Sequence, residues 1–473
     1  MKRPETYKTI DASDRHYFLS FLGDSQLLWE KEAMQEYGHD ETEDYQFEPE
    51  IVLKPQSTEE LSKILAYCHK QRIPVYSSGA RTGLSGGALP IYGGLVLSME
   101  KMNRILEIDE RNLQATVEPG VINQVFHEAC KEKGLFYPPD PSSWGSCTLG
   151  GNLALNAGGP KAVKYGVTNA YVLDLEVVLA TGEIIRTGAK VLKNSTGYNL
   201  TQLMVGSEGT LGVITKVIFK LIPYPKENRL MLIPFASAEK ACEAVSAIFQ
   251  AGIVPSGMEF MERDAIDYTL NFVDEVNLPI GPEVGAHLLV EVDGNYGDQL
   301  MEDCMKIADI VANFEAGEVL FADSENEKAA LWKLRRRVGE AVKSHSVYKE
   351  EDTVVPRAEL ATLLRGVKSI GAKYGFHSVC YGHAGDGNLH VNILKHKMND
   401  KAWQEDLPKG IREIFQLVKQ LGGTISGEHG IGLVQKDYLD IVFSPLEIAL
   451  QKQIKQVFDP HQILNPGKLF PDN

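Results

Sequence analysis

The first half of the chain alternates between short apolar runs and polar stretches, a pattern typical of mixed helices and strands. A helical period covers 57–71, where Ser57 precedes the first turn and Glu60 follows three positions later, as at a capped helix N-terminus. The next apolar run, IPVYSSGA at 73–80, predicts a buried strand that enters a turn. Residues 171–187 alternate around a Thr-Gly pair and predict a β-hairpin.

From about residue 226 the pattern changes to strands that alternate with longer helices. A strand and an alanine-rich helix are predicted over 230–250, followed by a strand at 285–293, a helix at 297–316 and a basic helix at 325–345. Strands that alternate with helices in this way predict a second α+β domain with an antiparallel sheet.

Composition narrows the class of protein. The 473 residues carry a formal net charge of −16, which argues against a nucleic-acid binder and against a polybasic membrane anchor. No apolar run approaches the ~20 residues of a membrane span, and the N-terminus lacks the apolar core of a signal peptide. The six cysteines lie far apart, which excludes C-x-x-C metal and redox motifs and a clustered iron–sulfur segment. Free thiols in a reducing cytoplasm are therefore expected.

Glycine is concentrated in two segments, 79–94 and 145–166, each with six glycines. The first contains the loop SSGARTGLSGG at 77–87, whose successive backbone N–H groups could form an anion site. Its spacing matches neither G-x-G-x-x-G nor the P-loop motif, so neither a Rossmann site nor a P-loop is supported. A tight surface loop without a ligand is the alternative interpretation of this segment.

Histidine is concentrated near the C-terminus. His383 and His390 are separated by a segment with two glycines, which predicts a bend that lets both imidazoles converge, and Glu428 and His429 follow in another glycine-rich segment. Two histidines and one carboxylate are a common set of ligands for a divalent metal. The alternative is that these histidines are structural, as we expect for His377 and His396 outside the motif.

Five motifs together resemble one protein family. They are S-G-A-R-T-G-L-S-G-G at 78–87, T-L-G-G-N-L-A-L-N-A-G-G at 148–159, G-S-E-G-T-L-G-V-I-T at 206–215, G-H-A-G-D-G-N-L-H at 382–390 and S-G-E-H-G-I-G at 426–432. In this order they resemble FAD-linked oxidases of the vanillyl-alcohol oxidase type, in the branch of glycolate oxidase, D-lactate dehydrogenase and D-2-hydroxyglutarate dehydrogenase.

The resemblance implies an α+β protein whose FAD-binding domain has two α/β subdomains and is followed by an α+β substrate domain with an antiparallel sheet. The expected boundaries are an N-terminal helical segment at 1–45, the FAD-binding domain at 46–225, the substrate domain at 226–424 and a C-terminal segment at 425–473 that packs on the flavin site.

The resemblance also implies which residues contact FAD. Those expected at the phosphates are Ser78, Gly79, Arg81, Thr82, Gly83 and Gly87. Those expected along the flavin are Pro139, Asp140, Ser146, Gly150, Gly151, Asn156 and Gly158. Those expected near the adenosine and ribityl portions are Glu208, Gly209 and Val213. Asn465 and Lys468 resemble the C-terminal return to the flavin, although a simple helix-stopping turn is the alternative. The first loop has no His or Cys, so a noncovalent flavin is expected.

For the substrate domain, the resemblance implies metal ligands at His383, His390 and Glu428, with Zn or Mn as the leading metals, and a catalytic base at His429. It implies substrate contacts from Arg335, Lys349 and Asn392. Relatives that act on 2-hydroxyglutarate carry Thr where this chain has Gly339, whereas EDTVVPR at 351–357 resembles the glycolate and lactate branch. The side chain of the acid is therefore left open.

These features predict an FAD-dependent dehydrogenase or oxidase that converts a D-2-hydroxy acid to the 2-oxo acid. Its electrons would pass to a separate acceptor, namely oxygen, a quinone, a cytochrome, an electron-transfer flavoprotein or an iron–sulfur subunit. A cytoplasmic protein, peripheral to the membrane where its acceptor lies there, and a homodimer are compatible with the sequence. The alternatives are another flavin oxidase on the same fold, a non-catalytic FAD-binding subunit of a glycolate-oxidase-like complex, and a metal-binding scaffold without flavin.

Overall fold

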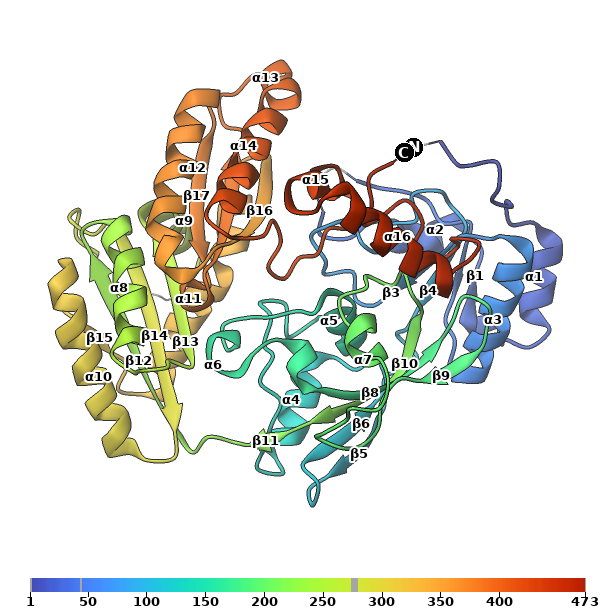
Figure 1. Ribbon diagram of the computed structural model, residues 1–473, viewed down its shortest axis with the longest axis horizontal. Coiled ribbons are helices and arrows are strands. Elements are labelled where there is room, and N and C mark those ends of the chain that lie inside the picture. The colour runs from blue at the N-terminus through green and yellow to red at the C-terminus, as the bar shows by residue number, and fades with distance from the viewer. Residues whose placement is uncertain (1, 43–44, 274–279, 473) are drawn as a thin grey trace. The chain divides into compact units, whose positions relative to one another are not determined.

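The computed structural model describes residues 2–42, 45–273 and 280–472 and divides into two units (Figure 1). The first unit comprises Met1–Ala157, Val167–Tyr224 and Glu428–Asn473, and the second comprises Gly158–Gly166 and Pro225–Gly427. The N-terminal segment and most of the C-terminal segment thus fall within the first unit, and a short piece of the second glycine-rich segment belongs to the second unit.

The first unit contains two main sheets. The strands of the four-stranded sheet, in spatial order, are β1 (Leu27–Leu28), β2 (Ile51–Leu53), β4 (Leu95–Ser98) and β3 (Val75–Ser78). Those of the antiparallel five-stranded sheet are β5 (Ile105–Asp109), β6 (Gln114–Val117), β10 (Val213–Lys220), β8 (Val172–Val178) and β9 (Ile184–Arg186). The predicted hairpin is confirmed, because β8 and β9 pair with Val178 opposite Ile184. A small ribbon joins β7 (Leu135–Phe136) to β11 (Ile222–Pro223).

Helices of the first unit surround these sheets. They are α1 (Ala12–Leu19), α2 (Lys31–Met34), α3 (Thr58–Gln71), α4 (Asn123–Lys131), α5 (Leu149–Leu155), α7 (Leu200–Met204), α15 (Leu439–Val442) and α16 (Pro445–Phe458). The Ser57 hydroxyl caps α3 by accepting the Glu60 N–H at 3.2 Å, as the sequence predicts. The Glu60 carboxylate accepts the N–H of Gln56 rather than that of Ser57. Four side chains of α3 are fully buried against the four-stranded sheet, which fixes the helix there: Leu61, Ile64, Leu65 and Cys68.

The second unit is built on a seven-stranded antiparallel sheet, as predicted. Its strands, in spatial order, are β15 (Leu320–Phe321), β12 (Glu227–Phe235), β14 (Ala286–Gly294), β13 (Gly257–Glu262), β17 (His377–Gly382), β18 (Asn388–Leu394) and β16 (Tyr348–Val354). Its helices are α6 (Ala162–Tyr165), α8 (Ala238–Gln250), α9 (Arg263–Phe272), α10 (Gly297–Val311), α11 (Glu325–Lys343), α12 (Leu360–Tyr374), α13 (Asp400–Glu405) and α14 (Leu407–Gln420).

Strand register decides which side chains of the second sheet share a face. Residues directly opposite one another lie on the same face, and successive residues alternate. The Met261, Val379 and Tyr381 side chains form one core with Leu334 and Val338 of α11, so this face is covered by α11. The same face carries His390 and Asn392. The α6 segment is held to this sheet by ion pairs of Lys161 with Glu291 and of Lys164 with Asp293.

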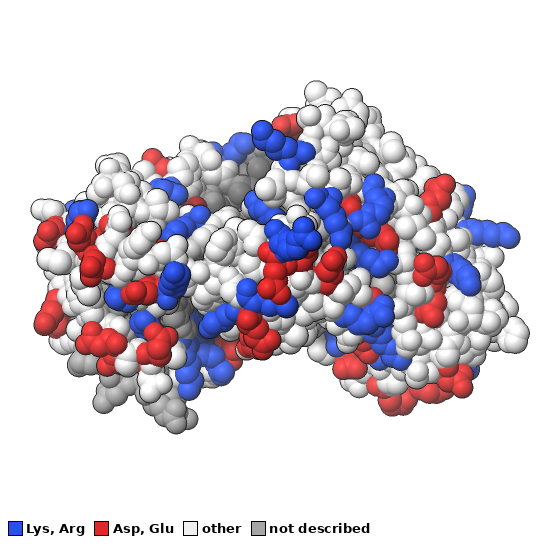
Figure 2. All heavy atoms as spheres, turned by 90° about the horizontal axis from the view of Figure 1, so that it is seen from below, with Lys and Arg blue, Asp and Glu red and all other residues white. Residues whose placement is uncertain are grey.

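Lys and Arg are interspersed with Asp and Glu on the face shown in Figure 2. All six cysteines are buried and form no disulfide. In the described ranges, no helix combines the length and the apolar composition needed to cross a membrane.

Candidate active site

The first glycine loop begins at the carboxyl end of β3, the edge at which parallel sheets place their ligands. Gly79 lies so close to the second loop that a Cβ there would be 2.3 Å from Thr148 Oγ1. Among the described residues, no atom lies within 4 Å of the Cβ position of Gly83, and only Ser85 Oγ, at 3.8 Å, lies that near the Cβ position of Gly87. The loop is therefore packed against the protein at one end and has open space beside its backbone further on.

Two side chains of the C-terminal segment hydrogen-bond to backbone carbonyls at the end of this loop. The Lys468 ammonium donates to Gly87 O at 2.9 Å, to Leu89 O at 2.6 Å and to Asn465 Oδ1 at 2.9 Å. The Asn465 amide donates to Gly87 O at 3.0 Å and to Glu208 O at 2.7 Å. Burial lowers the pKa of Lys468 to about 7, against the attraction of Asp40 and Glu208. Both residues thus fix the loop carbonyls, which is more than a helix-stopping turn requires.

Glu208 joins two further motifs within the same unit. Its backbone is left-handed, with φ +52°, and its buried carboxylate accepts the N–H groups of Ile431 at 2.8 Å and Gly432 at 2.7 Å. Burial raises the pKa of this carboxyl group, against the two N–H groups that lower it. The role of Glu208 in the structure is therefore to tie 206–215 to the chain after His429.

The second glycine-rich segment adds buried polar groups. Thr148 caps α5 by accepting the Gly151 N–H at 3.3 Å, and Asn156 ends the helix with φ +54°. Asn123 donates to Pro139 O at 3.1 Å. Its own Oδ1, together with Asn152 Nδ2, is buried without a hydrogen-bond partner among the described residues. Buried polar atoms of this kind are usually paired, so they indicate where a ligand supplies the partner.

Three of the expected FAD contacts have surroundings that differ from those of the buried loop residues. The Arg81 guanidinium lies over the Tyr37 ring at 4.5 Å, Ser146 is exposed and donates to Ser143 O, and Gly158 belongs to the second unit. Ser78 and Thr82 lie in the first glycine loop, and Gly150 and Gly151 lie in α5. Asp140 follows Pro139, Gly209 follows Glu208, and Val213 begins β10.

Replacing Lys468 by Met removes the three hydrogen bonds that hold the first loop and the Asn465 side chain. A hydrogen bond from a charged donor contributes about 1.5–3 kcal/mol, so we expect the dissociation constant for FAD to rise about 10-fold or more. Titration of the apoprotein with FAD, followed by quenching of flavin fluorescence, measures this constant. Lys190→Met is the matched control, since Lys190 pairs with Glu107 on the surface of the same unit. Equal affinity in the Lys468→Met protein and the control would contradict the role of Lys468.

The same pair of proteins makes a pH prediction with a definite sign. The pKa of Lys468 is about 7 in the folded chain, below the ordinary 10.5 expected when the chain unfolds. Between these values the unfolded chain binds one more proton, so this lysine makes the free energy of unfolding increase as pH rises from about 7 towards 10. Urea unfolding of both apoproteins at pH 7 and pH 9 should therefore show a larger pH-dependent gain for wild type than for Lys468→Met.

In the second unit, the structure brings His383 and His390 together. His383 follows β17 directly, and His390 lies in β18 after the short turn that contains both glycines. Their ring centroids are 5.4 Å apart, and one nitrogen of each ring lies within 4.8 Å of the other. Both side chains are buried, so the predicted convergence of the two imidazoles is present.

Each imidazole has a buried carboxylate beside it. Glu259 of β13 accepts a hydrogen bond from His383 Nδ1 at 2.9 Å and lies 2.6 Å from Arg335 Nη2. Although burial alone would raise it, His383 and Arg335 lower the pKa of Glu259 below its usual range. Asp352 Oδ1 lies 3.7 Å from His390 Nδ1. A carboxylate that fixes Nδ1–H directs the lone pair of Nε2 outward, as in histidines that bind metals.

Asp352 also fixes the chain that leads to Glu428. It accepts Asn388 Nδ2 at 2.7 Å, Ser426 Oγ at 3.0 Å and the Gly427 N–H at 2.7 Å. Glu428 is the next residue in the chain and the first of the segment that belongs to the first unit. The backbone immediately before the third expected metal ligand is therefore anchored beside His390.

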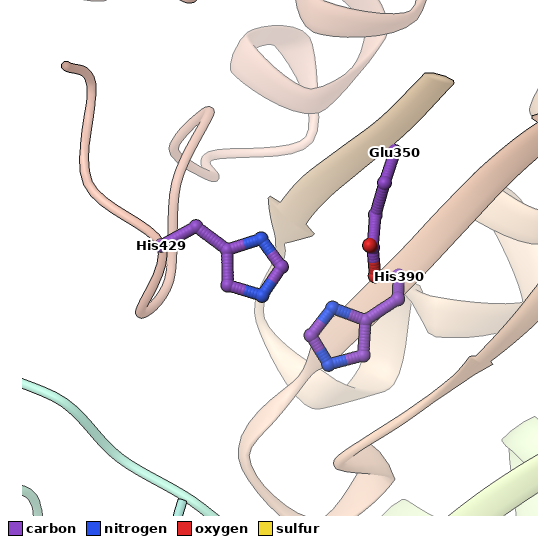
Figure 3. A group of neighbouring side chains, drawn as sticks. All are labelled: Glu350, His390 and His429. Carbon is purple, nitrogen blue, oxygen red and sulfur yellow. The ribbon is translucent and has the colours of Figure 1, made fainter. Parts of the chain in front are cut away.

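The register separates the expected substrate residues. Glu350 lies opposite Asn392 and Asp352 lies opposite His390, so all four side chains share one face. Lys349 lies opposite Ile393 and projects from the other face, so the structure does not bring it to the histidines. In Figure 3, Glu350 and His390 lie on the same side of the sheet of the second unit.

Arg335 and Asn392 retain unused polar capacity on this face. The Arg335 side chain is 4% exposed, and its Nε makes no hydrogen bond within the part of the chain that the structure describes. Asn392 is fully buried beside Tyr381, and neither its Oδ1 nor its Nδ2 has a well-formed hydrogen bond to a described residue. Both groups can therefore bind an added anion or hydroxyl.

Three acidic residues of this face were missed by sequence reasoning. Glu259 and Asp352 support the histidines, and Glu350 has an oxygen within 4.8 Å of a His390 nitrogen. A run of three acidic residues in the segment KEEDTVV is an available signal for Glu350 and Asp352. No comparable signal marks Glu259, which meets His383 only because β13 and β17 pair.

Comparison with known proteins shows the family of the chain. The FAD binding domain model matches residues 49–188, and the model for the C-terminal domain of FAD linked oxidases matches residues 224–469. The chain is 43% identical to the glycolate oxidase subunit GlcD of Bacillus subtilis, over 92% of each chain. It is 39% identical to a D-lactate dehydrogenase of Anaerostipes hadrus, over 95% of each chain. The structure of p-cresol methylhydroxylase with substrate bound shares the fold, with a TM-score of 0.78, 17% identity and 98% coverage of each chain.

Proposed function

The chain belongs to the FAD-linked oxidases, and on that basis we propose that it oxidises a D-2-hydroxy acid to the corresponding 2-oxo acid. The observation that carries this proposal is the pair His383 and His390, each beside a buried carboxylate, on the same sheet face as Asn392 and next to Arg335. Relatives named for glycolate and D-lactate support the same class of substrate.

The first unit fits FAD in two respects. The loop at 77–87 has open space beside Gly83 and Gly87, where a phosphate can approach the backbone N–H groups. The unpaired atoms Asn123 Oδ1 and Asn152 Nδ2 provide polar partners near the second loop. FAD supplies the acceptor for the hydride that leaves the substrate carbon. We infer that it is held noncovalently, because the first loop has no His or Cys.

The donor set of the second unit fits a divalent cation. His383 hydrogen-bonds to Glu259 through Nδ1, the arrangement that fixes an imidazole as a ligand. Asp352 lies 3.7 Å from His390 Nδ1, and Glu428 follows the anchored Gly427. We infer that these three residues hold Zn or Mn, both of which accept nitrogen and oxygen ligands. Such an ion supplies a Lewis acid that lowers the pKa of the substrate hydroxyl.

The remaining residues have roles that follow from their chemistry. The planar Arg335 guanidinium suits a bidentate contact with the substrate carboxylate. The Asn392 amide can bind the hydroxyl or the carboxylate. His429 would take the hydroxyl proton, because imidazole is effective as a base near neutral pH. The substrate thus loses a proton from oxygen and a hydride from carbon, which yields the 2-oxo acid.

We further infer that electrons leave the flavin to a separate acceptor, since the sequence has no clustered cysteines for an iron–sulfur segment. One relative is named as a subunit, which favours a protein partner such as an iron–sulfur or electron-transfer subunit. We place this function in the cytoplasm, at the membrane where a quinone or cytochrome is the acceptor. A homodimer of this chain is also compatible with the proposal.

Steady-state turnover with a dye as artificial electron acceptor tests this proposal. We expect reduction of the dye with glycolate or D-lactate and formation of one 2-oxo acid per two electrons. L-Lactate, which presents the opposite stereochemistry, should be a poor substrate. A flavin-containing protein that turns over none of these acids would support the alternative, a non-catalytic FAD-binding subunit.

A further inference from the structure

We propose that Glu350 restricts the enzyme to 2-hydroxy acids with a single carboxylate, by neutralising Lys343, the cation that a second substrate carboxylate would need. This inference rests on the proposed function and specifies its substrate class. It concerns short acids such as glycolate and D-lactate, as opposed to diacids such as D-malate and D-2-hydroxyglutarate.

Strand register places Glu350 among the candidate substrate residues. Glu350 in β16 lies directly opposite Asn392 in β18, two positions from the pair formed by Asp352 and His390. A carboxylate oxygen of Glu350 lies within 4.8 Å of a ring nitrogen of His390 (Figure 3). The position that faces the histidines is therefore acidic, although the neighbouring Lys349 would have suggested a cation.

Lys343 is the cation next to this carboxylate. It lies at the end of α11, with Nζ 2.7 Å from Glu350 Oε2, and the Tyr381 hydroxyl donates to Glu350 Oε1 at 3.3 Å. The Lys343 and Glu350 side chains are 21% and 8% exposed, respectively, so the pair is largely removed from water. Although burial alone would lower it, Glu350 raises the pKa of Lys343 above its usual range.

Two cations at this face are therefore paired with carboxylates before substrate arrives. Arg335 is paired with Glu259, and Lys343 is paired with Glu350. A monocarboxylate adds one negative charge, which a bound cation can balance while the Arg335 Nε–H, which makes no hydrogen bond to a described residue, donates to it. A diacid adds a second charge next to Glu350, where Lys343 is already neutralised. Placing like charges together in a poorly hydrated site disfavours binding, which is a common source of specificity.

Glu350→Gln tests this inference because it keeps the shape of the side chain and leaves Lys343 without its counter-charge. We expect the ratio of kcat/KM for D-2-hydroxyglutarate to that for D-lactate to rise at least about 10-fold. The dissociation constant for 2-oxoglutarate, which the oxidised enzyme cannot oxidise further, should fall relative to that for pyruvate, as measured by perturbation of the flavin spectrum. The double variant Glu350→Gln/Lys343→Met should lose this gain.

The matched control is Glu340→Gln. It removes a carboxylate of α11, the helix that carries Lys343, where Glu340 pairs with Arg337. It should leave both ratios unchanged. If Glu350→Gln also leaves both ratios unchanged, the inference is wrong, even when the wild-type enzyme oxidises a monocarboxylic acid. If the Glu350→Gln protein does not fold, the dissociation constants of the wild-type protein provide the test. Equal affinity for pyruvate and 2-oxoglutarate would overturn the inference. Failure of every acid to reduce wild-type flavin would instead refute the proposed function.

Discussion

Replacing His390 by Ala is expected to abolish reduction of the flavin by the hydroxy acid while FAD stays bound. His390 belongs to the second unit, whereas the residues that hold the glycine loop belong to the first. Loss of one of three ligands weakens the cation site, and a metal that polarises an oxygen contributes several kcal/mol to the reaction. We therefore expect the rate constant for flavin reduction to fall at least about 100-fold, measured anaerobically by stopped-flow absorbance.

His377→Ala is the matched control for this prediction. His377 lies in the same unit, at the start of β17, and pairs with Asp264 at 2.9 Å, with a side chain that is 44% exposed. Its removal should change neither the rate of flavin reduction nor the metal content measured by mass spectrometry. A His390→Ala protein that retains both the metal and the wild-type rate would show that His390 is not a ligand.

His429→Gln is expected to lower the rate of flavin reduction by about 10²–10⁴-fold, the usual contribution of a general base. Glutamine can hydrogen-bond to the substrate but cannot accept its proton at neutral pH. The metal content and the dissociation constant for FAD should therefore stay near those of wild type.

His461→Gln provides the comparison for the base prediction, because His461 lies in the first unit and contacts His69 O at 3.1 Å. It should react like wild type. If His429→Gln also reduces its flavin at the wild-type rate, another group takes the proton. If it loses the metal, His429 supports the cation site instead.

Local features of the fold were predictable from sequence, because their causes lie within a few residues. Ser57 starts α3 by capping the Glu60 N–H, and the Thr-Gly pair separates β8 from β9. The convergence of His383 and His390 was predictable for the same reason, since both flank one short turn.

Long-range contacts of the site were not predictable in this way. Glu259 meets His383 across 124 residues, and that contact depends on the pairing of β13 with β17. Lys349 illustrates a different difficulty, because a shift of one position in a strand moves a side chain to the opposite face. The register therefore places Glu350, rather than Lys349, beside His390.

Anaerobic reduction of the protein-bound flavin by a D-2-hydroxy acid tests the central claim most directly. We expect glycolate or D-lactate to bleach the visible flavin absorbance, whereas L-lactate should not. Prior treatment with a chelator should prevent bleaching until a divalent metal is restored. Bleaching that is indifferent to the chelator would contradict the metal site formed by His383, His390 and Glu428. A flavin that no 2-hydroxy acid reduces would contradict the proposed function itself.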